Sequence, residues 1–252
     1  MNWRLIEQKP YSAAMNMAIE HAVYESVANE REQPTIRFYK WLSSSVSIGA
    51  YQDYKDINLE ACKKHSISVV RRMTGGRAVF HDKNDFTYSV IAPIRIFGYR
   101  IDNAYRQICS CVINALKDLG ITAALEIKND IFASGKKISG NAAKAMSKGV
   151  YLQHGTLVYN IDMGLMPKTL DISEEEVREK VTSILEHKRL SQKKVYEALK
   201  SSFSLGKEIT TGHISKYEML RAEELAKTRY SNILLPAGTF TRKRGACYVE
   251  RG

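Results

Sequence analysis

The chain has 252 residues, with 38 Lys and Arg against 27 Asp and Glu, which gives a formal net charge of +11. Hydrophobic residues make up 44% of it and charged residues 26%, a composition typical of a folded chain that buries a sizeable core. Gly and Pro are few, and the four cysteines are scattered and expected to be reduced thiols, so collagen-like, disordered and disulfide-scaffold classes are excluded. No apolar run approaches the roughly 20 residues of a membrane span, and no signal peptide is visible, so we expect a cytoplasmic protein without a membrane partner.

In chain order, the first strong pattern is a helix over residues 13–28, which Ser12 caps and which carries an apolar stripe. Short β-rich runs follow at residues 35–39, 45–48 and 68–72, with a helix near residues 58–65 before the last of them. The clearest helix runs from about Tyr105 to Leu119, because its apolar residues recur at helical spacing and Gly120 stands at its end.

The second half of the chain changes from extended to helical patterns. Extended segments are expected around residues 123–126, 136–140 and 155–160. Helices are expected after Ser173 and Ser215, which both match the S-x-x-E capping box, and from Ser191 to about Phe203. Strands with interspersed helices, followed by helices together, predict an α+β fold with a largely antiparallel or mixed sheet.

A glycine-rich stretch, RRMTGGRAVFHD at residues 71–82, is the first candidate site. Its two glycines would let backbone N–H groups approach an anion, and three arginines add positive charge beside them, so the stretch could cradle a phosphate. It matches neither of the common nucleotide-binding loops. The alternative is a hairpin turn between two strands, which is the more common role of a Gly-Gly pair.

The second candidate site combines three short segments, at residues 129–131, 135–142 and 153–157. A lysine in a strand bordered by small residues can bind a phosphate or carboxylate, and Asn129 with Asp130 could hold a hydrated Mg²⁺. The alternative is a surface strand on which at least one of Lys136 and Lys137 is solvated. A lone His154 is more typical of a hydrogen-bonded structural histidine than of a base.

Together these segments resemble the lipoate-protein ligase family, within the biotin/lipoate ligase superfamily. The family's R-x-x-[ST]-G-G-G-x-V-x-H-D stretch corresponds to Arg71–Asp82, its N-D-[IL] to Asn129–Ile131, its K-[IV]-[SAM]-G-x-A to Lys137–Ala142 and its H-G-[ST]-L to His154–Leu157. The resemblance runs in order from Trp3 to about Tyr230. It implies a biotin/lipoate ligase-like fold, related to class II aminoacyl-tRNA synthetases and biotin synthetase, with a mixed, mostly antiparallel sheet flanked by helices.

The resemblance also implies a two-step reaction: lipoate and Mg-ATP form lipoyl-adenylate, and a lysine of an acceptor protein then attacks it. The expected acceptors are acidic lipoyl domains of 2-oxoacid dehydrogenase complexes and the glycine-cleavage H protein, which the +11 charge would attract. ATP and Mg²⁺ are the expected cofactors, with lipoate or octanoate as substrate and no tightly bound prosthetic group.

By the same resemblance, Lys137 is the expected catalytic residue, bridging the acyl carbonyl and the adenylate phosphate, and Asp130 is the expected Mg²⁺ ligand. The residues expected to bind ATP or the adenylate are Arg72, Thr74, Gly75, Gly76, Arg77, Ala78, Val79, Phe80, His81, Asp82, Asn129, Asp130, Lys137, Gly140, Ala142, His154, Gly155 and Thr156.

One departure from the family pattern keeps a second function open. The third glycine of the loop is Arg77, a form that also looks like the related octanoyltransferases, which move an acyl group from a carrier protein without ATP. Those enzymes need a cysteine nucleophile. In the members most similar to this chain the cysteine lies shortly before the lysine strand, where residues 121–139 contain none, and the four cysteines present are expected to be inert. The ligase is therefore the favoured prediction, with the octanoyltransferase as alternative.

The other departure is length. Full-size ligases carry a C-terminal accessory domain, whereas only a basic tail, residues 231–252, follows the expected catalytic domain at residues 1–230. We therefore expect a separate small accessory subunit. A nucleic-acid binder, a function of a different class, is disfavoured because the 14 tyrosines are spread along the chain and not clustered with the basic residues.

Overall fold

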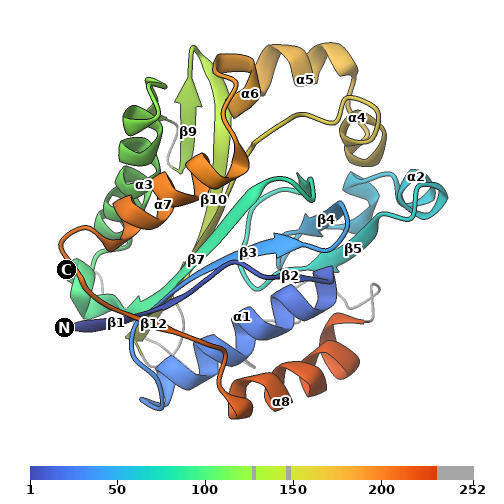
Figure 1. Cartoon of the computed structure of the whole chain (residues 1–252). Helices are drawn as coiled ribbons and strands as arrows, with labels where there is room; N and C mark the ends of the chain where they lie inside the picture. The colour runs from blue at the N-terminus through green and yellow to red at the C-terminus, as the bar shows by residue number, and fades with distance from the viewer. Residues whose placement is uncertain (127–128, 146–148, 232–252) are drawn as a thin grey trace, which may run out of the picture.

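The computed structural model describes residues 1–126, 129–145 and 149–231. A nine-stranded sheet runs through this part of the chain, in the order β12-β1-β3-β7-β11-β10-β9-β8, with β2 beside β3 (Figure 1). Its strands are β1 (Asn2–Ile6), β2 (Pro10–Tyr11), β3 (Thr35–Trp41), β7 (Phe86–Pro93), β8 (Ala124–Glu126), β9 (Asp130–Ala133), β10 (Lys136–Ala145), β11 (Val150–Leu157) and β12 (Glu208–Gly212).

The middle of the sheet is buried on both faces. β7 pairs antiparallel with both β3 and β11, and every residue of β11 is buried. β1, in contrast, pairs parallel with β3 and with β12. The sheet is therefore mixed and mostly antiparallel, which confirms the predicted α+β fold.

Helices cover both faces of the sheet. α1 and α8 lie together on one face, and α3 and α7 lie on the other (Figure 1). Each face has its own hydrophobic core, and Ser12 caps α1 as predicted by accepting a hydrogen bond from the backbone N–H of Met15. The helices are α1 (Ala13–Ala28), α2 (Leu59–Lys64), α3 (Ile101–Asp118), α4 (Met166–Leu170), α5 (Glu174–Lys180), α6 (Ile184–His187), α7 (Gln192–Ser204) and α8 (Lys216–Leu225), which a π-helical turn, Ala226–Tyr230, extends.

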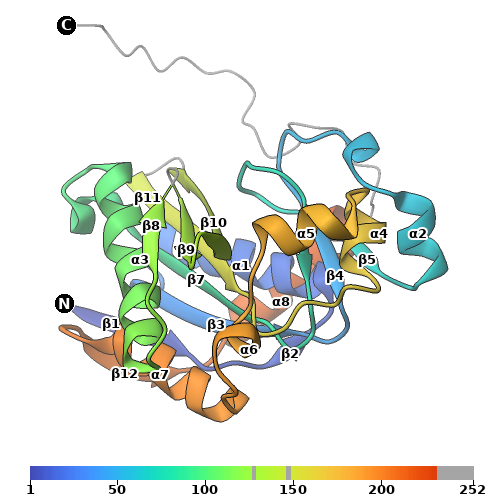
Figure 2. The ribbon, with the colours of Figure 1, turned by 90° about the horizontal axis from the view of Figure 1, so that it is seen from above.

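A small second sheet stands beside the first and carries the Gly-Gly segment. Its strands are β4 (Ser45–Ile48), β5 (Ser68–Arg71) and β6 (Val79–His81), in the order β5-β4-β6. Viewed from above, it lies beside α2 and α4, away from α3 (Figure 2). Because β5 and β6 pair with opposite edges of β4, residues 72–78 cross over that strand. The hairpin-turn alternative for Gly75 and Gly76 is therefore wrong.

Some predicted boundaries are also wrong. β11 covers Val150–Leu157, whereas the extended segment was expected at residues 155–160, and the last third holds the strand β12 among its helices.

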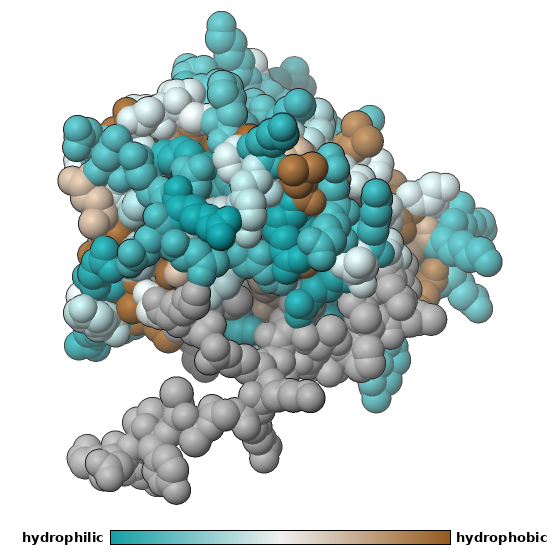
Figure 3. Space-filling model, turned by 90° about the horizontal axis from the view of Figure 1, so that it is seen from below, coloured by the Kyte–Doolittle hydropathy of each residue, from teal (hydrophilic) through white to brown (hydrophobic). Residues whose placement is uncertain are grey.

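The exposed surface seen from below, on the side of α1 and α8, is largely hydrophilic (Figure 3). Residues 232–252 lie outside the described residues, so the division into residues 1–230 and a tail stays a prediction. In the described part of the chain, no helix is long and apolar enough to cross a membrane.

Candidate active site

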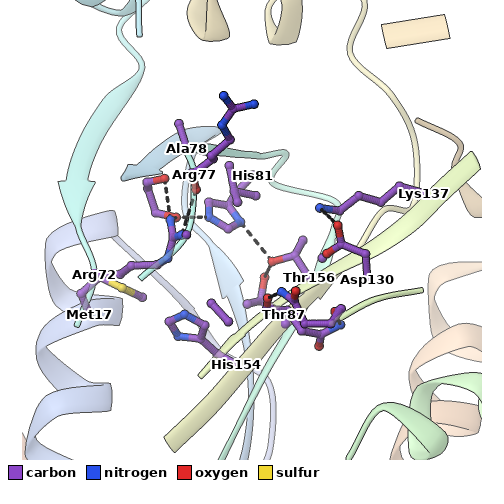
Figure 4. A pocket seen from close by; sticks show the side chains of 18 of the residues that line it. Met17, Arg72, Arg77, Ala78, His81, Thr87, Asp130, Lys137, His154 and Thr156 are labelled. Atoms are coloured by element: carbon purple, nitrogen blue, oxygen red, sulfur yellow. Dashed lines mark hydrogen bonds and ion pairs between the residues drawn. The ribbon is translucent and has the colours of Figure 1, made fainter. Parts of the chain in front are cut away.

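The candidate site is a cavity of about 270 Å³ between the two sheets and α1 (Figure 4). It lies where β3, β7, β10 and β11 of the large sheet face β4 and β6 of the small one. Its wall is formed by Met17, Tyr39, Trp41, Ser47, Arg72, Gly76, Arg77, Ala78, Val79, His81, Thr87, Asn129, Asp130, Lys137, Gly140, Asn141, Ala142, His154, Gly155 and Thr156. Both candidate segments from the sequence therefore meet in one place.

The Gly-Gly segment forms a loop over the cavity. Gly76 has φ +96°, a conformation that side chains rarely adopt, and Gly49 faces the Gly76 carbonyl so closely that a β-carbon at residue 49 would clash with it. Arg72 holds this loop from below: its Nη2 donates to the carbonyls of Gly75 at 2.7 Å and Arg77 at 2.8 Å. The backbone path of the loop therefore needs glycine at Gly76, within the loop, and at Gly49, which faces it.

The guanidinium of Arg72 is fully occupied by protein groups. Besides the two loop carbonyls, Nη1 donates to the carbonyl of Ser47 at 3.0 Å and Nε donates to Oγ1 of Thr74 at 3.2 Å. Burial lowers the pKa of Arg72 to about 10, which leaves it charged at neutral pH. Arg72 was expected to stabilise an anion directly, whereas the structure uses its N–H groups to hold the loop.

His154, on β11, lies in a second hydrogen-bonded chain. Its Nε2 is 2.7 Å from Oγ1 of Thr74, and its Nδ1 is 2.9 Å from Oε1 of Glu20 on α1. The carboxylate of Glu20 can only accept, so Nδ1–H of His154 donates to it, and in this tautomer Nε2 accepts from the hydroxyl of Thr74. His154 therefore has both of its nitrogens satisfied inside the wall.

His81, on β6, is held in the same way. Its Nε2 is 2.7 Å from Oγ of Ser47 and its Nδ1 is 3.1 Å from Oγ1 of Thr156, while its ring stacks on Trp41 with centroids 4.1 Å apart. Burial lowers the pKa of His81 well below its usual value, and the neighbouring positive Arg72 lowers it further. His81 is therefore a neutral ring at physiological pH. Trp41 in turn donates its indole N–H to Thr87 at 2.9 Å.

The two charged groups that face each other at the mouth are Lys137 and Asp130 (Figure 4). Nζ of Lys137 lies 2.8 Å from Oδ2 of Asp130, and the side chains are 37% and 22% exposed. Gly140 leaves room for this pair, since a β-carbon there would be 2.9 Å from Cε of Lys137. Lys136 turns away and donates to the carbonyl of Arg178, so one of the two lysines enters the site.

Some predicted site residues lie outside the cavity wall. Phe80 packs in the hydrophobic core of the small sheet, Asp82 caps the β6–β7 turn by accepting from the N–H of Asn84, and Thr74 stands behind His154. Gly75 lines a neighbouring groove. Arg77 does reach the cavity and has an exposed side chain.

The sequence prediction missed Trp41, Thr87, Asn141 and Glu20 as parts of the site. Asn141 stands between Gly140 and Ala142 in a motif that was recognised, so it could have been included. Trp41 and Thr87 could have been found only through the strands that carry them, of which β7 was not predicted at all. Glu20 had one usable signal, a carboxylate among the many apolar residues of the first helix.

None of the three described cysteines lines the cavity; Cys62 and Cys109 are buried in the cores, and Cys111 packs partly buried against one of them. Cys62 is in the core of the small sheet, and Cys109 is buried beneath the large sheet, where Nε2 of Gln153 lies 3.5 Å from its Sγ. Burial raises the pKa of Cys109 to about 12, and burial also raises the pKa of Cys111. These thiols are therefore protonated at neutral pH. Cys247 lies outside the described residues.

Known proteins similar to this chain fit the geometry. Residues 12–204 match the family described as the lipoyl protein ligase A/B catalytic domain. Octanoyltransferase LipM of Brevibacillus brevis is 31% identical, with 91% of this chain and 96% of that protein covered. Octanoyltransferase LipM of Halalkalibacterium halodurans is 32% identical, with 90% and 96% covered.

Among solved structures, a bi-partite lipoate protein ligase from Thermoplasma acidophilum, described with its E2 lipoyl domain, superposes with a TM-score of 0.82. It is 29% identical to this chain, and 98% of this chain and 100% of that chain are covered. Its fold therefore extends over nearly all of the chain.

These similarities correct the predicted function. Curated relatives matched over nearly their whole length are named octanoyltransferases, so the predicted ATP-dependent lipoate ligase is wrong. The predicted cofactors ATP and Mg²⁺ are wrong with it. The described residues contain no group of three or more His, Cys, Asp or Glu that could hold a metal, and Asp130, the expected Mg²⁺ ligand, is paired with Lys137.

The matched family and the mixed sheet flanked by helices agree with each other, and this chain belongs to the lipoyl protein ligase A/B catalytic domain family.

Proposed function

We propose that this protein is an acyltransferase of protein lipoylation, which transfers an octanoyl group from the thioester of a carrier protein to a lysine of a lipoyl-domain protein. The support comes from the names of the relatives and from the chemistry of the cavity. The acceptors are acidic lipoyl domains or the glycine-cleavage H protein, and the net charge of +11 would speed their encounter with the site.

The observation that carries the proposal is the internal satisfaction of the cavity wall. Arg72, His81 and His154 direct their N–H groups and ring nitrogens to other protein groups. The indole N–H of Trp41 likewise donates to the hydroxyl of Thr87. A wall whose polar atoms bond to one another presents its carbon surfaces to a ligand. Met17, Val79 and Ala142 add apolar surface, so the cavity suits an alkyl chain, for which each buried methylene contributes about 0.8 kcal/mol.

Lys137 is the group placed to stabilise the negative charge that develops during acyl transfer. With the alkyl chain inside the cavity, the carbonyl carbon stays at the mouth, beside the Lys137 ammonium. During attack by an amine, negative charge develops on the carbonyl oxygen, and a cation placed in advance stabilises that charge more than it stabilises the ground state. The Lys137 ammonium is therefore placed to stabilise the oxyanion of a thioester whose alkyl chain fills the cavity.

The test is acyl transfer by the purified chain from octanoyl carrier protein to an unmodified lipoyl domain, followed by mass spectrometry of the acceptor. We expect transfer without ATP, and no stimulation when Mg-ATP is added. Lys137→Ala should lower the rate by about 10²–10³-fold, as loss of an oxyanion-stabilising group does. Lys136→Ala is the matched control and should retain the rate, because its side chain points away from the cavity.

Failure to transfer from the thioester, or transfer that requires Mg-ATP and free octanoate, would contradict the proposed function. A separate accessory subunit stays a prediction, and the same assay tests it, because it uses this chain alone.

A further inference from the structure

The cavity of the candidate active site has two different ends. Lys137 and Asp130 stand at its mouth, and Met17 of α1 lies on the opposite side (Figure 4). Met17 is 2% exposed and also belongs to the hydrophobic core between α1 and the large sheet. Its side chain therefore separates the inner end of the cavity from that core.

Two aromatic residues of β3, Tyr39 and Trp41, share both the cavity wall and this core with Met17. Trp41 donates its indole N–H to Thr87, and its ring stacks on the ring of His81. The guanidinium of Arg37 lies over the ring of Tyr39, 4.2 Å from its centroid. Neither aromatic ring can move without giving up such a contact, so both form a rigid part of the wall.

Met17 is the adaptable part of the inner end. A methionine side chain is unbranched, has three rotatable bonds and fills irregular gaps in a core. The thioether of Met17 packs in an apolar cluster, so its end can change rotamer without breaking a polar contact. The space available at the inner end therefore depends on the size and position of this one side chain.

We propose that Met17 sets the length of the acyl chain that this protein transfers, because the chain ends against its side chain. The inference rests on the proposed function and names a specificity-determining residue for it. With the carbonyl carbon beside Lys137, the alkyl chain runs inward, and its terminal methyl group is the part that reaches Met17. The matching substrates are unbranched acyl chains of medium length with an apolar end.

Chain length is then selected from both directions. A chain that stops short of Met17 buries fewer methylenes, and each one lost lowers kcat/KM about fourfold. A chain that is too long pushes Met17 into the packed core, and overpacking of this kind costs about 5- to 150-fold. Because methionine adapts its shape, we expect the penalty for a longer chain to lie near the lower end of that range.

A competition assay tests the inference. Equal concentrations of hexanoyl, octanoyl and decanoyl carrier protein are offered together with one lipoyl domain, and mass spectrometry of the acceptor gives the ratios of kcat/KM. The wild type should produce mainly the octanoyl product. Met17→Ala removes the sulfur and the terminal methyl group, which leaves room for a longer chain. It should raise the ratio of decanoyl to octanoyl product at least about tenfold, since two more methylenes are buried.

Met17→Phe tests the same assignment in the opposite direction. Its larger and more rigid side chain shortens the space, so the ratio of hexanoyl to octanoyl product should rise by a similar factor. Met15→Ala is the matched control, because Met15 lies on the same helix and packs partly buried against the same core but does not line the cavity. Its product ratios should equal those of the wild type.

A product ratio does not depend on how much of the enzyme is folded, so a loss of stability in Met17→Ala cannot imitate the expected shift. An unchanged ratio in either Met17 variant, or the same shift in Met15→Ala, would overturn the assignment while transfer by the wild type leaves the proposed function standing. Equal use of all three donors by the wild type would overturn it in the same way. No transfer by the wild type from any of the donors would overturn both the proposed function and this inference.

Discussion

His154 on β11 lies 2.9 Å from the carboxylate of Glu20 on α1, and this contact joins residues 134 positions apart in the sequence. Glu20 is 1% exposed and His154 is 7% exposed. Thr74 extends this series of hydrogen bonds from His154 to Arg72, which holds the loop over the cavity. The pair thus couples the helix beneath the sheet to the loop that closes the site.

Glu20→Gln should destabilise the fold. The amide keeps the size of the side chain and an acceptor oxygen, but it replaces a hydrogen bond to a charged group with a neutral one, which lowers the contribution of that bond by about 1 kcal/mol. Urea unfolding followed by circular dichroism measures the loss. Glu223→Gln, which changes an exposed glutamate on α8, is the control and should have no effect. Equal stability of both variants and the wild type would show that the pair contributes nothing.

Arg72→Lys should impair acyl transfer although it preserves the charge. The planar guanidinium bonds two loop carbonyls from one nitrogen and the strand β4 from another, a fork that an ammonium cannot reproduce. We expect a loss of about 2 kcal/mol of stability and a raised KM for the acyl donor, because the loop is held less well. Arg189→Lys, at an exposed position, is the control. A normal KM in Arg72→Lys would mean that the loop holds its shape without the fork.

Much of the fold follows from local signals in the sequence. Ser12, Ser191 and Ser215 each accept a hydrogen bond from the backbone of the helix they precede, as their spacing predicted. The strand β7 was missed although Phe86–Val90 alternates between apolar and polar side chains, the pattern of a strand. The polar members, Thr87 and Ser89, are buried as well, and the place of the strand between β3 and β11 depends on pairing with distant segments.

The site was predictable as a set of segments, but its chemistry was not. The glycine loop, Lys137 and His154 were all expected, and the sheets bring them together. What an arginine or a histidine does there depends on its partners, and those come from other elements: Ser47 for His81, and Glu20 for His154. A sequence shows which side chains can donate or accept hydrogen bonds, but not which of them are already bonded to other protein groups. Arg72 was therefore expected to bind a ligand.

Gly140→Ala should reduce acyl transfer while changing stability little. Its β-carbon would lie 2.9 Å from Cε and 3.0 Å from Nζ of Lys137, so the flexible end of the lysine has to move away from Asp130. We expect at least about a tenfold lower kcat, since misplacing a catalytic group by 1 Å can cost about 10²-fold. Gly164→Ala, at an exposed glycine whose nearest neighbour is a carboxylate, is the control. An unchanged kcat would mean that Lys137 does not need its observed position.

His21 should make stability depend on pH below neutrality. It joins α1 to the π-helical turn, with its Nδ1 3.1 Å from the hydroxyl of Tyr230 and its Nε2 3.5 Å from Glu25. Burial lowers its pKa to about 4, opposed by Glu25 and reinforced by Arg229 and Arg221, whereas an unfolded histidine has a pKa of about 6.5. Between these values the unfolded chain binds more protons, so this stability is present above pH 6.5 and is lost as the pH falls toward 4.

The loss from His21 amounts to about 3 kcal/mol over that range, with a slope of at most about 1.4 kcal/mol per pH unit. Urea unfolding between pH 4 and 7 measures it, and His21→Gln should flatten the curve by close to one bound proton. His213→Gln, at an exposed histidine, should keep the wild-type slope. Because His81 also has a lowered pKa and its contribution has the same sign, part of the slope should survive in His21→Gln. Identical slopes in the wild type and His21→Gln would mean that folding does not shift the pKa of His21.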